Sequence, residues 1–347
     1  MEHSPSPSLS TLSDAPSDAT IHYLRSISPR LDSYVQTDGK DDTVFLIETT
    51  YKHLPSDGQH NLANDIDDCS SDEELRQLVT NIETALLRPV KALGGKTAPV
   101  TPSPRAGVED SMEGLRGAVD DPIKREQRRL RDEGLKRQAN ECAFTKIYEE
   151  SAHPHPPGRM LGALEAAHIL PFFSLGTFET EEERDRICII WNTVYRYFPA
   201  VRSRLNFGYE NLNDVCNVMM LLGPLHAHFG SFKLALEPTA VDNQYKIRKF
   251  FNQTSSSYPW FYNYFPDGDL VTLTSHDPRY PVPHRVLLET HFLIASILHA
   301  TGRGEIVELN QRKYGETGTL ASDGSMDIAG LLSVTTLGPS NEVAVLS

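Results

Sequence analysis

The chain has 347 residues, a net charge of −14 at pH 7 and a hydrophobic content of 39%. This length allows one to three domains, and the modest apolar fraction predicts disordered flanks around them. The negative charge argues against a protein that coats nucleic acid over its whole surface. Because no apolar run approaches the length of a membrane span, a membrane partner is not expected.

The first 20 residues are mostly Ser, Pro and Asp. They contain neither a basic start nor an apolar core, so we predict disorder over residues 1–20 rather than a secretion signal. The four cysteines are widely spaced and form no Cys-x-x-Cys pair, which argues against a structural zinc finger. Together these features predict an intracellular protein, cytoplasmic or nuclear, that is not secreted and keeps its thiols reduced.

Helical signals dominate residues 21–93. The segment from Ser71 to Glu74 reads as a capping box, and apolar residues at helical spacing follow it up to Pro89. Apolar stretches over 21–31 and 44–54 complete what we predict to be a small helical module. Residues 94–122 are rich in Gly, Pro, Ser and Thr, which predicts a linker.

A basic helix is predicted over residues 123–137, which hold seven Lys and Arg against three Asp and Glu. Two interpretations stay open: a solvated helix face, or a face that contacts phosphates. In the second interpretation nucleic acid would meet Arg125, Arg128 and Arg129. Two residues of a later loop, Arg202 and Arg204, would add guanidinium groups that suit phosphate.

Two short motifs near the middle of the chain predict a catalytic site. In the first, His168 ends an apolar segment and is soon followed by a proline, which tends to stop a strand. In the second, eight residues separate Asn217 from His226. Between them, Val218–Leu222 are typical of a strand, and Pro224 suits the first turn of a helix. This order predicts a β-β-α unit with one base, one orienting amide and one metal ligand.

Two further helices are predicted over residues 180–197 and 286–299, and Gly302 ends the second. After Arg312 the chain is rich in Gly, Ser and Thr, which predicts a disordered tail over 311–347. We therefore expect an α+β fold in which a domain over residues 123–310 includes the last helix.

The motif pair resembles the HNH endonuclease family, and in particular its fungal members with an Ala-Ala-His-Ile motif, the AAHI type. The resemblance covers roughly residues 123–308 and rests on five segments. The first, Cys142–Thr145, is similar to the family's entry strand, so we expect a strand there. The others are Leu164–Pro171, Asn213–Asn217 with His226, His226–Glu237 and His291–Glu305. It implies a ββα-metal core, also called an HNH or His-Me finger core, embellished with helices. The implied activity is hydrolysis of DNA phosphodiester bonds with a divalent metal.

By this resemblance His168 is the general base, Asn217 orients it, and His226 binds the metal, which would be Mg²⁺, Mn²⁺ or Zn²⁺. A site with one imidazole predicts weak binding, since Mg²⁺ keeps several waters and few protein ligands. The pattern has Ala167 and Gly230 at two places where many family members have ligands. These two residues motivate an alternative, a catalytically degenerate HNH fold that acts as a binding or interaction module.

Overall fold

The computed structural model describes residues 27–91, 103–105, 108, 127–170, 180–250 and 269–306. In these ranges helices combine with three small β-sheets, which confirms the predicted α+β class. The segments 1–20 and 311–347, and most of the linker predicted over 94–122, lie outside the described residues. Among the described helices, none has the length and apolar character that a membrane span requires.

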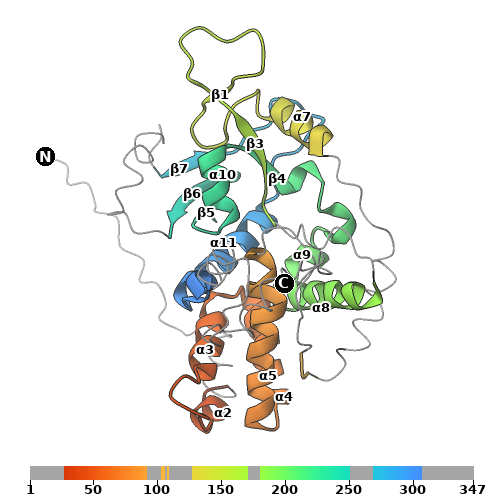
Figure 1. The fold of residues 1–347 in the computed structure, drawn as a ribbon, viewed down its shortest axis with the longest axis vertical. Coiled ribbons are helices and arrows are strands. Elements are labelled where there is room, and N and C mark those ends of the chain that lie inside the picture. The colour runs from red at the N-terminus through yellow and green to blue at the C-terminus, as the bar shows by residue number, and fades with distance from the viewer. Residues whose placement is uncertain are drawn as a thin grey trace, which may run out of the picture.

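The N-terminal part of the described chain is helical and forms the lower part of the molecule in Figure 1. Its elements are α2 (Ser28–Asp32), α3 (Thr43–His53), α4 (Ser56–Asp68), α5 (Asp72–Ile82), the π turn η2 (Glu83–Leu87) and the 3-10 turn η3 (Pro89–Lys91). The capping box predicted at the start of α5 is confirmed. The Ser71 hydroxyl accepts from the Glu74 backbone N–H, and the Glu74 carboxylate accepts from the Ser71 N–H at 3.1 Å. These bonds satisfy donors that have no partner inside a helix.

The remaining elements alternate helices with short strands, and the strands lie in the upper part of Figure 1. In chain order they are α7 (Gln127–Arg137), β1 (Tyr148–Glu149), β2 (Leu161–Gly162), β3 (Leu164–His168), α8 (Glu181–Tyr197), α9 (Ala200–Ser203), η5 (Tyr209–Asn211), η6 (Val215–Asn217), β4 (Val218–Leu222), α10 (Gly223–Gly230), β5 (Leu234–Pro238), β6 (Gln244–Lys249), β7 (Leu270–Thr272) and α11 (Arg285–Ala300). The sheets pair β1 with β2, β3 with β4, and β5 with β6 and β7.

The two later helices that the sequence predicts are confirmed. The helix α8 begins after Thr180, whose side chain accepts from the Glu183 N–H, and ends at Tyr197. The helix α11 packs against both β5 and α3, so it connects the sheets to the N-terminal helices. Gly302, which follows α11, has a φ of 70°, a left-handed conformation that favours glycine at a helix end.

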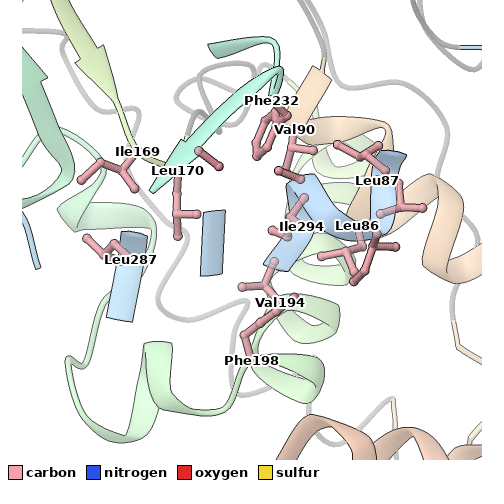
Figure 2. Packing of buried hydrophobic residues seen from close by; sticks show 14 of the residues in the cluster. Leu86, Leu87, Val90, Ile169, Leu170, Val194, Phe198, Phe232, Leu287 and Ile294 are labelled. Carbon is pink, nitrogen blue, oxygen red and sulfur yellow. The ribbon is translucent and has the colours of Figure 1, made fainter. Parts of the chain in front are cut away.

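One hydrophobic core joins the N-terminal helices to the rest of the described chain. Figure 2 shows side chains that meet there from four parts of the chain: Leu86, Leu87 and Val90, Val194 and Phe198, Ile294, and Phe232. The helices predicted as a module over 21–93 therefore bury their apolar face against α8 and α11. The division into separate domains stays a prediction.

The entry strand that we predicted at Cys142 is wrong, because this segment forms a turn. The Lys146 N–H donates to the Cys142 carbonyl at 3.1 Å, and Lys146 has a φ of 58°, which ends any extended run. Only Ala143 reaches the neighbouring strand, where its N–H donates to the Met220 carbonyl at 3.0 Å.

Candidate functional site

The two predicted strands of the site pair with each other in the structure. β3 and β4 are antiparallel, with Leu164 opposite Leu222 and His168 opposite Val218. The helix α10 begins directly after β4 and packs on β3 (Figure 1). The proline predicted for the first turn of this helix is there. His168 thus ends one strand, and His226 lies in the first turn of the helix that follows the other.

His168 is buried, with 7% of its surface exposed. Its Nε2 lies 3.2 Å from the Oδ1 of Asn213. Because an amide oxygen can only accept, the neutral ring carries its proton on Nε2 and keeps the basic lone pair on Nδ1. The orienting partner of His168 is therefore Asn213, a residue that the sequence analysis placed in the motif without giving it this role.

Asn217 does not make the direct contact with His168 that we expected. It is fully buried, and its side chain accepts from the Leu170 N–H at 3.0 Å while donating to the carbonyls of Leu170 and Leu212. The register explains the difference. His168 lies opposite Val218, so Asn217 lies one step further on, beside Ile169, and neighbouring strand positions face opposite sides. Asn217 instead holds the backbone two residues after His168.

His226 contacts a carboxylate that the sequence analysis did not single out. Its Nδ1 lies 2.6 Å from the Oε2 of Glu165, and the two side chains are 33% and 54% exposed. Gly223 makes room for this pair, because a Cβ at that position would lie 3.1 Å from the Glu165 Oε1. The pair thus offers one imidazole nitrogen and one carboxylate oxygen at an open surface.

The imidazole of His226 and the carboxylate of Glu165 fit an open divalent-cation site better than a structural zinc site. Among the described residues, no group of three His, Cys, Asp or Glu side chains is placed to hold a metal ion. A structural zinc site needs four such ligands. Two ligands suit a hard divalent cation that keeps waters and takes oxygens from a substrate. Glu165 and His226 therefore fit an open, substrate-completed cation site.

The two positions that depart from the family pattern have different surroundings. Ala167 is fully buried within β3. Gly230 ends α10 four residues after His226, and a Cβ there would have the His226 ring as its nearest neighbour, at 3.9 Å. A side chain at position 230 would therefore point toward the same spot as His226.

The predicted nucleic-acid contacts are distributed over two surfaces. Arg125 and the side chain of Arg128 lie outside the described residues. Arg129 is exposed on α7 and forms an ion pair with Glu133. Arg202 and Arg204 are exposed at the end of α9, and the Arg202 guanidinium lies 5.3 Å from the centre of the Tyr195 ring.

Not all of the basic helix is available to a partner. On α7, Arg131 forms an ion pair at 3.0 Å with Glu149, and Arg137 is fully buried. The open choice between a solvated face and a phosphate-binding face therefore concerns only the other cations of this helix.

An antiparallel strand pair, the turn before its second strand and the helix after that strand carry His168, Glu165, Asn217 and His226. His168 lies at one end of the strand pair, and the Glu165–His226 pair lies toward the other. Residues 142–237 match a protein-family model described as HNH endonuclease. The match supports an HNH domain in this chain and, for that domain, a nuclease-type function. Neither the curated proteins nor the solved structures contain a match to the chain.

Proposed function

We propose that the chain is an endonuclease that hydrolyses DNA phosphodiester bonds with a divalent cation at the β3–β4–α10 unit. The observation that supports this proposal most is the joint placement of His168 and His226 on one strand-strand-helix unit inside the matched HNH region. The fungal AAHI type, the ββα-metal core and an intracellular location belong to the same proposal.

His168 is the general base in this proposal. An imidazole titrates near neutral pH, so its neutral form can take a proton from water. In the tautomer that donates to the Asn213 Oδ1 from Nε2, the basic lone pair is on Nδ1, a buried atom that the attacking water has to reach. Asn217 contributes through the backbone, because it fixes Leu170 at the exit of the strand.

Glu165 and His226 hold the cation in this proposal. A bound divalent cation supplies charge neutralisation at the phosphate and at the leaving oxygen. The two side chains are partly exposed and come from different elements, a strand and a helix, which leaves the remaining coordination positions to water and substrate. Two protein ligands predict weak binding of Mg²⁺, Mn²⁺ or Zn²⁺.

DNA is the proposed partner, and local cations rather than the overall charge would attract it, since the chain carries −14. Exposed Arg129, Arg202 and Arg204 are the described candidates, together with Arg125 and Arg128.

The proposal is tested by plasmid nicking with and without Mg²⁺ or Mn²⁺, and by calorimetric titration of Mn²⁺. We expect nicking that chelation abolishes, and metal binding that disappears in both His226→Ala and Glu165→Gln. Matched controls are the exposed His60→Ala and Glu181→Gln, which change the same side chains away from the site and should leave both readouts unchanged. Binding that survives both site variants contradicts the assigned ligands.

The degenerate fold remains the second candidate, and Ala167 and Gly230 are the observations that favour it. It predicts a stable protein that neither nicks DNA nor binds Mn²⁺. Binding tighter than about 1 mM that is lost in His226→Ala counts against this candidate.

The position of Gly230 allows a gain-of-function test between the two candidates. We expect Gly230→His to raise the affinity for Zn²⁺ or Mn²⁺ by about tenfold, or 1.4 kcal/mol, because a second imidazole one helical turn after His226 faces the same spot. The matched control is Ala227→His, since neighbouring helix positions do not face each other. Equal affinities of the two variants would show that the His226 face of α10 does not bind metal.

A further inference from the structure

Arg137, the last residue of α7, points inward although the sequence places it in a basic helix. Its guanidinium is fully buried and donates to two backbone carbonyls that flank η6. They belong to Val215, the first residue of η6, at 2.6 Å, and to Val218, the residue directly after it, at 2.7 Å. A longer bond of 3.5 Å reaches the Pro281 carbonyl, and Nη2 also donates to the Gln138 Oε1 at 2.8 Å. One side chain thereby connects the end of α7 to the segment that leads into β4.

The burial of this cation is unusual because no carboxylate forms an ion pair with Arg137 among the described residues. Burial lowers the pKa of Arg137 to about 10, so the guanidinium is still charged at neutral pH. A buried charge is strongly unfavourable unless hydrogen bonds satisfy it. Here carbonyl oxygens satisfy Nη1 and Nη2 through charge-assisted bonds, and the planar guanidinium can reach two of them at once. The Arg137 Nε is buried and has no hydrogen-bond partner among the described residues.

The two carbonyls lie close in sequence to Asn213 and Asn217, the two residues that connect this segment to His168 and to the backbone after it. Asn213, two residues before Val215, contacts the His168 Nε2. Asn217, the last residue of η6, holds the N–H and the carbonyl of Leu170, two residues after His168. A displacement of η6 would therefore move both Asn213, which contacts the imidazole, and Asn217, which holds the backbone two residues after it.

Gln138 extends the same contact along β4. Its Oε1 accepts from the Met220 N–H at 2.9 Å, and its Nε2 donates to the Met220 carbonyl at 3.1 Å. These groups lie on the edge of β4 that does not pair with β3. Together with the Ala143 N–H, which also donates to the Met220 carbonyl, the two side chains that end and follow α7 thus satisfy this strand edge.

We propose that Arg137 is a positioning residue for the candidate base: by holding both ends of η6, it makes Asn213 and Asn217 keep His168 in one orientation. The expected effect on cleavage rests on the proposed function of His168. The expected effect on the orientation and tautomer of the His168 ring does not depend on that function. Cleavage and ring orientation can therefore be tested separately.

The test compares Arg137→Ala and Arg137→Lys with the wild-type chain. We expect nitrogen-15 NMR of the wild type to show the His168 proton on Nε2, and both variants to show a mixture of tautomers. Lysine keeps the charge, but its ammonium cannot bridge two carbonyls as a guanidinium does. Nicking should fall by about 100-fold, the order expected for a misplaced catalytic group. Guanidinium ion, added well below denaturing concentrations, should restore both readouts in Arg137→Ala only.

A matched control separates positioning from loss of stability. Arg303 is a partly buried arginine, paired with Asp42 and Glu83 between α11 and the N-terminal helices. Arg303→Ala should destabilise the fold and leave the His168 tautomer unchanged. If Arg137→Ala does not fold, Arg137→Lys alone decides. A wild-type tautomer signal in a folded Arg137 variant would overturn the proposal, whether or not the wild-type chain cleaves DNA.

Discussion

His168→Ala should lower metal-dependent plasmid nicking by about 100-fold to 10,000-fold, the usual contribution of a general base. The reason is chemical, because alanine cannot take a proton from water. The measurement is the initial nicking rate at saturating Mg²⁺ or Mn²⁺.

Two comparisons make this result specific to the base. Metal affinity should be unchanged in His168→Ala, since Glu165 and His226 are intact and lie at the other end of the strand pair. Asn213→Ala should lower the rate less than His168→Ala, because it removes only the hydrogen bond that orients the ring. Nicking that His168→Ala leaves undiminished would refute the assigned role.

Arg196→Met should reduce the free energy of unfolding by about 3–5 kcal/mol, the usual cost of leaving a buried charge without its partner. Arg196 lies on α8 and contacts the fully buried carboxylate of Asp65 on α4, with Nη2–Oδ1 at 2.7 Å. Burial raises the pKa of Asp65, and the Arg196 guanidinium opposes this shift. The measurement is urea unfolding followed by tryptophan fluorescence, since Trp191 lies on the same helix.

The matched control is Arg186→Met on the same helix, where the 3.9 Å pair with the exposed Glu182 should contribute less than about 1 kcal/mol. The double variant Asp65→Asn with Arg196→Met should recover part of the loss, because it also removes the buried charge. Equal stabilities of Arg186→Met and Arg196→Met would show that α4 and α8 are not joined by this pair.

Local patterns predicted elements wherever the cause of the structure is itself local. The capping box at Ser71 and the helix from Thr180 depend on side chains that bond to their own first turn. The apolar run Val218–Leu222 is a strand because its residues are buried on both faces, with four of the five fully covered. The turn at Cys142 escaped prediction because the left-handed Lys146 that closes it has no strong sequence signal.

The site was predicted only in part. The resemblance to HNH endonucleases located His168, Asn217 and His226. The structure places His168 on β3, Asn217 on η6 directly before β4, and His226 on α10. The resemblance did not distinguish Asn213 from Asn217 as the partner of the imidazole. Both belong to one short segment, and only the strand register decides which amide faces His168.

Apolar periodicity and turn chemistry were sufficient to predict the fold class and the two strands, because they act between neighbours in the chain. The resemblance to HNH endonucleases supplied the candidate base and the helix histidine. Only the tertiary structure brought Glu165 to His226, 61 residues away, and turned Arg137 from a surface cation into a buried support of the β4 edge. Both contacts depend on how separate elements pack against each other. The sequence around a charged residue does not reveal them, because it is the same whether the partner is water, a distant carboxylate or a backbone carbonyl.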